Sequence, residues 1–419
     1  MKFINRLLAV ALALVVFSSC GNSGPRSSDE ISSHSKSTSE SSAMAETTAA
    51  RSTAAPVTTP SATTPEVTTT LPPEPEYYSV RLLCAGDNLI HSSIYNQAAM
   101  RAGSNGVDGY DFSFPYEKIE RYVADADLAI LNQETIVTDE LEPSDYPRFC
   151  SPEALGEHMI DIGFDVFSMS NNHILDHGEK GLLAALDFWD RHPEVIRYGA
   201  YRDEADMENI RLKTVNNITF AFLGYMEHTN GLSLPKDSKC KITYLKELDT
   251  IEAQIRHAKE LADVVIVSPH FGIEVTNEVT DSQRELAKKF VEWGADLIIG
   301  TQPHTAQTME YIERPDGTRG FCYYCLGNFI SSMDRPLAMV GIMGSLNVLK
   351  NSQTGEISFE NIKAIPIIDQ YGQSYYQVHI VPYAEYTEAD LKSHGCAGFN
   401  QDIIDKVLSN IPEEYLAIE

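Results

Sequence analysis

The chain has 419 residues, with 60 acidic and 32 basic side chains and a formal net charge of −28 at pH 7. Because a surface this acidic repels nucleic acid and anionic membranes, neither is expected as a partner. The length after the N-terminal segments suits one large globular unit, or one such unit with a small C-terminal appendage. Seven cysteines at irregular spacings give no disulfide framework that can be read from the sequence.

Residues 1–20 have the pattern of a bacterial secretion signal. Lys2 and Arg6 precede an unbroken apolar run over residues 7–17, which is too short to span a bilayer as a mature helix. Two serines and Cys20 follow, and a cysteine after small residues resembles a lipobox. We therefore expect lipidation of Cys20 and a protein on the extracellular face of the bacterial cell membrane, held there by its lipid only. An ordinary signal peptide with a chance cysteine is the alternative.

Residues 21–79 are rich in Ser, Thr, Ala and Pro and contain almost no large apolar side chains. Such a segment cannot bury enough surface to offset its ordering entropy, so a disordered tether is predicted. We assign residues 80–383 to a globular domain and residues 384–419 to an acidic, helical C-terminal segment.

The globular part alternates apolar runs with helical periodicity. Strands are predicted over residues 80–85, 128–131, 166–169, 219–223, 264–268, 297–299 and 321–326, and helices over 115–124, 153–162, 181–191, 248–262 and 282–293. This alternation indicates an α/β layered architecture. The order is less regular than a pure βαβ series, so two facing sheets flanked by helices are plausible.

Five predicted strands end in side chains that bind or orient metals, and ligands in open α/β sheets collect at the carboxyl ends of strands. The candidates, in chain order, are Asp87, His91, Asn132, Glu134, Asn171, Asn172, His173, Asp176, His270, Glu274, Gln302 and His304. Each motif alone is also compatible with an ordinary turn or helix cap. Together, mixed nitrogen and oxygen ligands suit zinc, manganese or iron(II). Two such ions about 3.5–4 Å apart can activate a water and stabilise a displaced oxygen.

Six sequence blocks occur in a fixed order between about residues 80 and 330: GDN-x-x-H, NQE, NNH-x-x-D-x-G, H-F-G-x-E, P-H-x-x-Q and LGNF. This order resembles the poly-γ-glutamate capsule synthesis proteins, the CapA/PgsA family. The resemblance implies a calcineurin-like metallophosphoesterase fold with two facing mixed β-sheets flanked by helices. It also implies one or two divalent metal ions, Mn, Zn or Fe.

The resemblance further implies roles for individual residues. The metal ligands would be Asp87, Glu134, Asn172, His270 and His304. His173 would act as the catalytic acid or as a partner of the metal ligands, oriented by Asp176. Further ligands or site residues would be His91, Asn132, Glu274 and Gln302.

Three positions depart from the family pattern. Phe271 replaces a tryptophan, and Gln133 stands where an apolar residue is expected. Gln302 stands where a histidine commonly precedes Pro-His, and its amide oxygen is a weaker ligand. A site with one metal, or a weakly loaded site, is therefore an alternative to a dinuclear centre.

Two classes of function follow from the resemblance. The first is a metal-dependent hydrolase or transferase that uses metal-activated water on an anionic cell-surface polymer such as poly-γ-glutamate, or on a phosphoester. The second is a non-catalytic protein that binds polymer and assembles or anchors capsule, together with membrane capsule-synthesis proteins. Because the chain is acidic, polyanion binding needs a metal or local cations. Arg148 and Arg335 are candidates for those cations, and ordinary surface or salt-bridge roles are the alternative.

Overall fold

The computed structural model describes residues 76–103 and 109–418, which belong to one compact unit. The predicted secretion signal, Cys20 and the tether up to residue 75 lie outside the described residues. None of the described helices combines the length and apolar character needed to cross a lipid bilayer. All six cysteines in the described part are buried and unpaired.

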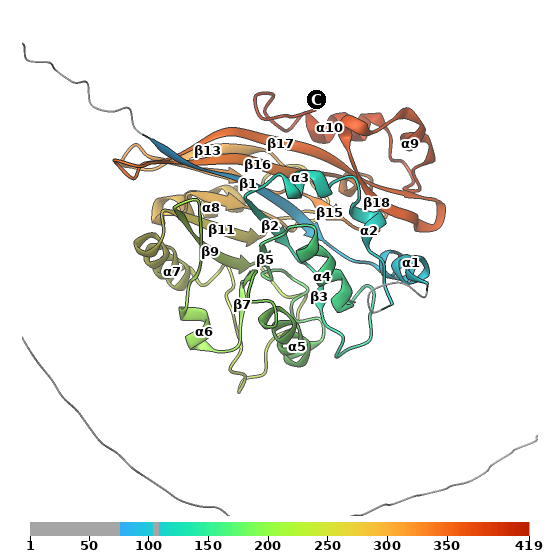
Figure 1. Ribbon diagram of the computed structural model, residues 1–419, viewed down its shortest axis with the longest axis horizontal. Helices are drawn as coiled ribbons and strands as arrows, with labels where there is room; N and C mark the ends of the chain where they lie inside the picture. Colours follow the sequence, from blue (N-terminus) through green and yellow to red (C-terminus); the bar gives the residue numbers. More distant parts are fainter. Residues whose placement is uncertain (1–75, 104–108, 419) are drawn as a thin grey trace, which may run out of the picture. The chain divides into compact units, whose positions relative to one another are not determined.

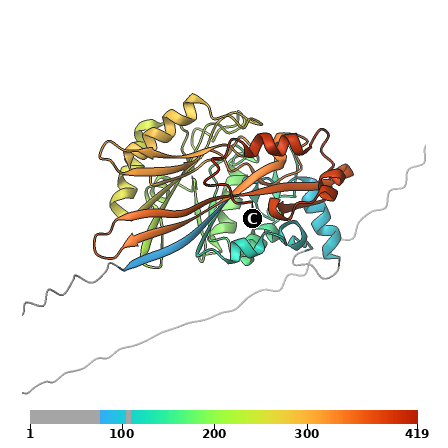
Figure 2. The same cartoon turned by 90° about the horizontal axis from the view of Figure 1, so that it is seen from above.

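The first of two large sheets has eight strands, in the order β18-β17-β16-β1-β2-β5-β6, and β15 pairs with the end of β1. The strands β1, β2, β5 and β6 are parallel, whereas β16, β17 and β18 are antiparallel. Figures 1 and 2 show the long β16 and β17 running beside β1. The bounds are β1 (Tyr77–Asn88), β2 (Leu128–Asn132), β5 (Val166–Ser168), β6 (Ile196–Tyr198), β15 (Asn328–Ile330), β16 (Val340–Asn351), β17 (Ile357–Gly372) and β18 (Tyr376–Pro382).

The second large sheet has six strands in the order β13-β14-β12-β11-β9-β8. Its inner strands are parallel and both edge strands are antiparallel. The bounds are β8 (Arg211–Val215), β9 (Ile218–Met226), β11 (Val264–His270), β12 (Leu297–Ile299), β13 (Met309–Glu313) and β14 (Arg319–Tyr323). Two small ladders pair β3 (Ile136–Val137) with β4 (Cys150–Ser151) and β7 (Ala200–Tyr201) with β10 (Lys241–Ile242).

Helices lie outside the sheets: α7 lies beside β9 and β11, and α8 beside β13 and β14 (Figure 1). Their bounds are α1 (Ser92–Ala102), α2 (Ser113–Tyr116), α3 (Glu120–Ala124), α4 (Glu153–Asp161), α5 (Gly178–Asp190), α6 (Glu204–Glu208), α7 (Leu248–Leu261), α8 (Asp281–Trp293), α9 (Glu388–Ser393) and α10 (Gln401–Leu408). The single helix predicted over residues 115–124 is wrong, because a turn between α2 and α3 separates two short helices. Tyr116, the last residue of α2, and Ile119, the last residue of the turn, are both buried.

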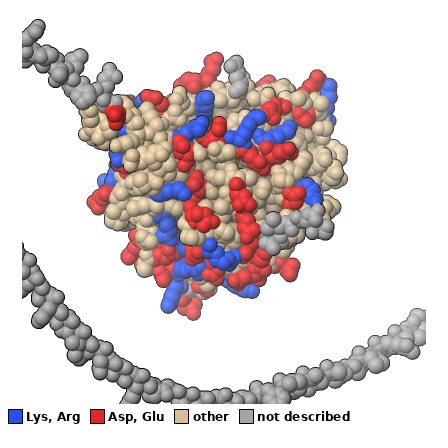
Figure 3. Space-filling view, in the orientation of Figure 1, with Lys and Arg blue, Asp and Glu red and all other residues tan. Residues whose placement is uncertain are grey.

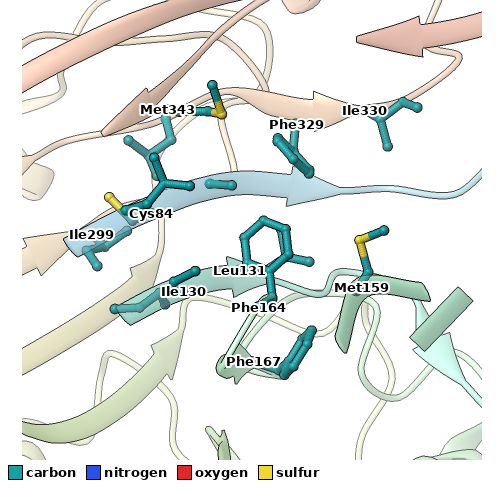
Figure 4. Close-up of a cluster of buried hydrophobic side chains, with 14 of the residues drawn as sticks. Cys84, Ile130, Leu131, Met159, Phe164, Phe167, Ile299, Phe329, Ile330 and Met343 are labelled. Atoms are coloured by element: carbon teal, nitrogen blue, oxygen red, sulfur yellow. The ribbon is translucent and has the colours of Figure 1, made fainter. Parts of the chain in front are cut away.

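The core explains why several strands are continuous apolar runs. On β11, Val264 and Ile266 belong to the large core between the sheets, whereas Val265 and Val267 pack in a second cluster with residues of α7 and α8. A strand buried on both faces needs apolar side chains at every position. Figure 4 shows the large core around β1, including Cys84, Leu131 and Phe167.

The predicted fold class, an α/β layered domain with two facing mixed sheets flanked by helices, is confirmed. The strand predicted over residues 321–326 ends early, at Tyr323, because the chain then leaves the sheet and Leu326 N–H donates to the carbonyl of Gly300. The C-terminal segment contains α9 and α10, and its residues Ile404 and Val407 belong to the large core. A domain boundary at residue 383 stays a prediction.

Candidate metal centre

The candidate ligands lie at the carboxyl ends of parallel strands from both sheets. In the first sheet, Asp87 lies near the end of β1, Glu134 follows β2 and Asn172 follows β5. In the second sheet, His270 is the last residue of β11 and His304 follows β12. All five side chains are buried. The site is therefore built where the two sheets meet.

A group of three residues forms the centre of this site. One ligand atom each from Asp87, Glu134 and His304 lies within 4.8 Å of the others. His304 Nδ1 lies 3.0 Å from Asp87 Oδ2, and His304 Nε2 lies 3.9 Å from Glu134 Oε1. The predicted ligands are thus brought together by segments that are far apart in the sequence.

The other two predicted ligands lie against this group. His270 Nε2 is 3.7 Å from Glu134 Oε1 and 3.1 Å from the side-chain oxygen of Asn172. The opposite ring nitrogen of His270 lies 2.8 Å from Thr301 Oγ1, which fixes the ring with Nε2 facing Glu134. Asn132 Nδ2 donates to Asp87 Oδ1 at 2.8 Å and so orients that carboxylate.

The residues present fit a divalent cation. Both oxygens of Glu134 are buried and have no hydrogen-bond partner among the described residues, and Asp87 Oδ2 forms an ion-pair contact with His304 but no hydrogen bond. An unpartnered buried carboxylate oxygen is costly unless a cation or proton compensates it. Carboxylates and imidazoles together are the donor set of borderline first-row metals. The arrangement is therefore a candidate site for one or two such ions.

Burial and mutual charge shift the pKa values of the four ionisable side chains in this group. Burial and the charge of Asp87 raise the pKa of Glu134 well above its usual range. Burial alone would also raise the pKa of Asp87, but the contact and charge of His304 lower it below its ordinary value. Burial opposes a charge on His304, yet Glu134 and Asp87 raise the pKa of that imidazole to about 10. Burial lowers the pKa of His270 to about 3, so this ring is neutral and has a free nitrogen to offer a metal.

His173 and Asp176 form a separate pair beside the group. His173 Nδ1 lies 2.7 Å from Asp176 Oδ2, and the same oxygen accepts a 2.7 Å hydrogen bond from the amide of Phe149. The Phe149 ring meets His173 edge-on, with centroids 4.8 Å apart. Asp176 Oδ2 therefore contacts the ring of His173, and the catalytic roles that the resemblance implies for the two residues stay a prediction.

A pocket of about 400 Å³ opens over this pair. It is lined by Tyr146, Pro147, Arg148, Asn172, His173, Asp176, Asn230, Leu232 and Glu274. Asn172 and His173 therefore connect the metal group with a space that can hold a ligand. Glu274, a candidate from the sequence, lies on the pocket wall and accepts a 3.4 Å hydrogen bond from Gln302 Nε2.

Two other candidates from the sequence are placed differently. His91 lies outside the three-residue group: its Nδ1 accepts from the amide of Ser332 at 3.1 Å, and burial lowers its pKa to about 4. Asn171 donates to the carbonyl of Gln133 and supports the turn that carries Asn172.

Positive backbone angles occur at the end of β12. The φ angle is 99° at Gln302 and 57° at His304, a region that non-glycine residues rarely adopt. Such strain persists only where the surrounding structure holds it, and it is common at functional sites. The oxygen Oε1 of Gln302 is buried without a hydrogen-bond partner among the described residues.

Sequence reasoning missed several supporting residues. Gln133, expected to be apolar, is buried and accepts from Asn88 Nδ2 at 2.7 Å, while its own amide group donates to Thr135. The side-chain oxygen of Asn328 lies 3.0 Å from His304 Nδ1. Asn328 belongs to the LGNF block, but nothing in the sequence linked that block to His304.

Comparison with known proteins identifies the family. Residues 81–333 match the family model described as bacterial capsule synthesis protein PGA_cap. The chain is 27% identical over 235 residues to the capsule biosynthesis protein CapA of Bacillus anthracis, covering 54% of this chain and 55% of that protein. It is 33% identical over 172 residues to the PGA biosynthesis protein CapA of Bacillus subtilis strain 168, covering 41% of this chain and 43% of that protein. The match thus spans about half the length of each relative.

Two solved structures show limited similarity. A phosphatase from Mycoplasma pneumoniae has 14% identity and a TM-score of 0.41, covering 69% of this chain and 94% of that one. A putative 5′-nucleotidase from Staphylococcus aureus has 14% identity and a TM-score of 0.44, covering 79% of this chain and 58% of that one. The match of the family model over most of the folded part is the decisive finding: this chain belongs to the bacterial capsule synthesis protein PGA_cap family.

Proposed function

We propose that this chain is a lipid-anchored protein on the extracellular face of the bacterial cell membrane. It acts in the synthesis, export or anchoring of a capsule polymer such as poly-γ-glutamate, as a metal-dependent hydrolase or transferase. The names of the two CapA relatives support the polymer class. The lipobox-like sequence at Cys20 supports the anchor.

One observation carries the catalytic part of the proposal. The unpartnered oxygens of Asp87 and Glu134 face two imidazoles in a buried group that adjoins a pocket. Asp87, Glu134, His270, His304 and Asn172 would hold the metal. A divalent ion bound there would supply an activated water and charge stabilisation for a displaced oxygen.

His173 is placed to move a proton at the substrate. Its Nδ1 is engaged by Asp176, and Nε2 has no hydrogen-bond partner among the described residues. A ring held in this way donates its Nδ1 proton to the carboxylate and uses Nε2 as the acid or base nitrogen. We propose that His173 Nε2 donates a proton to the leaving oxygen of the substrate.

Arg148 is the cation best placed to hold an anionic substrate. It lines the pocket, is exposed, and forms no ion pair within the described part of the chain. Figure 3 shows acidic side chains spread among basic ones over the visible face, so a polyanion gains little from the general surface. Arg335 does not line this pocket, and its guanidinium donates to the carbonyl of Asp334. Recognition is therefore local to the pocket.

A turnover assay tests this function. Purified full chain, loaded with Mn²⁺, is given bis(p-nitrophenyl) phosphate and, separately, poly-γ-glutamate. We expect hydrolysis of at least one of them and its loss in His173→Gln, with metal content unchanged. His192→Gln, which removes a surface histidine paired with Glu194 at 3.2 Å, is the matched control and keeps full activity. A metal-loaded protein that binds the polymer but turns over neither substrate would favour the assembly role.

A further inference from the structure

The side-chain amide of Asn328 has one orientation. Its Nδ2 lies 3.1 Å from the carbonyl oxygen of Ala338 and 2.9 Å from Ser331 Oγ. Because a carbonyl only accepts hydrogen bonds, this atom is the donor nitrogen of the amide. The oxygen Oδ1 must then face His304 Nδ1, 3.0 Å away, and the imidazole donates its Nδ1 proton to it.

Ser331 connects Asn328 to a carboxyl group on β17. Its hydroxyl accepts from Asn328 Nδ2 and donates to Asp369 Oδ2 at 2.8 Å. The backbone amide of Ser331 donates to the same oxygen at 2.7 Å. Ser331, Asn328 and Asp369 are all buried. A continuous chain of hydrogen bonds therefore runs from Asp369 through Ser331 and Asn328 to His304.

The C-terminal part of the molecule holds this chain in place. The carbonyl of Asp369 lies 2.9 Å from His394 Nε2, and the Tyr371 hydroxyl donates to the carbonyl of Met333 at 2.8 Å. At the other end, the amide of Asp87 donates to the carbonyl of Gly327. Gly86 permits this approach, because a Cβ there would lie 1.9 Å from that carbonyl oxygen.

This chain of hydrogen bonds determines which of two oxygens accepts the Nδ1 proton of His304. His304 Nδ1 lies 3.0 Å from Asn328 Oδ1 and also 3.0 Å from Asp87 Oδ2. If the Nδ1 proton goes to Asn328, Asp87 Oδ2 remains free, and this oxygen indeed has no hydrogen-bond partner among the described residues. The other ring nitrogen, Nε2, faces Glu134 and can offer its lone pair to a metal that displaces its proton.

We propose that Ser331 and Asp369 are positioning residues that act through Asn328: they direct the His304 Nδ1 proton away from Asp87 and so prepare both residues to bind a metal. The inference rests on the proposed metal centre. Asp369 lies beyond residue 333, where the match to the family model ends, so the inference gives this later region a role in the metal centre. Partners of this kind typically change metal affinity about 10- to 100-fold when they are removed.

The test measures Co²⁺ binding to the full chain by competition with a chelator, together with the visible absorption of the bound Co²⁺. Ser331→Ala removes the hydroxyl that links Asn328 to Asp369, and Asp369→Ala removes the carboxylate that accepts from Ser331. Both should weaken binding roughly 10- to 100-fold and change the absorption spectrum. Asp369→Asn should bind as the wild type, since its amide oxygen accepts the same two hydrogen bonds. If Asp369→Ala does not fold, Ser331→Ala carries the test.

Asp296→Asn is the matched control. Asp296 is a buried carboxylate that accepts from the amide of Val265 and pairs with Lys259 and Arg314, and it precedes β12 at the end away from His304. Normal Co²⁺ binding in this variant supports the inference. Wild-type affinity in both Ser331→Ala and Asp369→Ala would overturn it, as would an equal loss in Asp296→Asn. A wild-type chain that binds no Co²⁺ would instead overturn the metal centre itself, and the positioning role with it.

Discussion

His270 Nε2 lies 3.1 Å from the side-chain oxygen of Asn172, a contact that joins the two large sheets. Asn172 follows β5 of the first sheet, and His270 ends β11 of the second. Glu134 Oε1 lies 3.7 Å from the same nitrogen. The candidate metal centre is thus assembled by the packing of the sheets, and variants that leave the core intact can remove ligands one at a time.

Glu134→Gln should stabilise the metal-free protein. Both oxygens of Glu134 are buried without partners and lie near the carboxylate of Asp87, so a neutral amide removes an unfavourable charge. In the presence of a chelator at pH 8, we expect the Tm to rise by about 2–4 °C, which corresponds to about 1 kcal/mol. Thermal unfolding with added Mn²⁺ gives the second half of the test. The wild type should gain stability from the ion and the variant should not; a lower Tm for the variant in chelator would contradict this account.

Gln302→His should tighten metal binding. The amide oxygen of Gln302 is buried and unpartnered, and an imidazole is a stronger ligand for borderline metals. Zn²⁺ affinity, measured by chelator competition, should rise about 10-fold or more, which corresponds to about 1.4 kcal/mol. Gln302→Asn keeps an amide and serves as the control. An unchanged affinity in Gln302→His would place this side chain outside the ligand set.

Arg148→Ala should weaken substrate binding and leave the metal in place. Arg148 lines the pocket beside His173 but belongs to none of the metal-binding groups. A charge-assisted contact to an anion contributes about 1.5–3 kcal/mol, so KM for an anionic substrate should rise about 10-fold or more. The comparison is Arg335→Ala, which removes a cation away from this pocket. Equal effects of the two substitutions would show that only the overall charge matters.

Asp369→Asn should change how stability depends on pH. Burial raises the pKa of Asp369 to about 8, above its value of 3.8 in the unfolded chain. A raised folded pKa favours the protonated native state, so this contribution to stability is complete below about pH 4 and is lost as the pH rises to 8. Since an amide does not ionise, the variant should gain about 2–4 kcal/mol relative to the wild type between pH 5 and pH 8. Urea unfolding at several pH values measures this difference, and parallel curves for the two proteins would refute it.

The parts of the site nearest to apolar strands could be predicted from the sequence. Asp87, Glu134, His270 and His304 follow or end runs of buried residues, and the parallel strands of each sheet bring such positions to one edge of that sheet. The meeting of the two edges comes from the packing of the sheets, which local patterns do not encode. Their roles as ligands stay a prediction until metal is measured.

The supporting residues could not be predicted in this way. Asp369 lies on β17, an antiparallel strand whose mixed burial pattern gives no clear period, and it reaches the site only through Ser331. The pairing of β15 with β1 places Asn328 opposite Asp87, a contact between distant segments that no local spacing encodes. Long-range strand pairing is fixed by the packing of the whole domain, and therefore escapes a reading of local patterns.

Metal content tests the central claim most directly. The purified full chain, Asp87→Ala and His270→Ala are each loaded with zinc, manganese or iron(II), dialysed and measured by elemental mass spectrometry. We predict one or two ions per wild-type chain, lost in both variants, with circular dichroism showing the same folded content in all three proteins. A wild-type chain that stays metal-free after loading, or variants that retain the wild-type content, would contradict the assignment of this site.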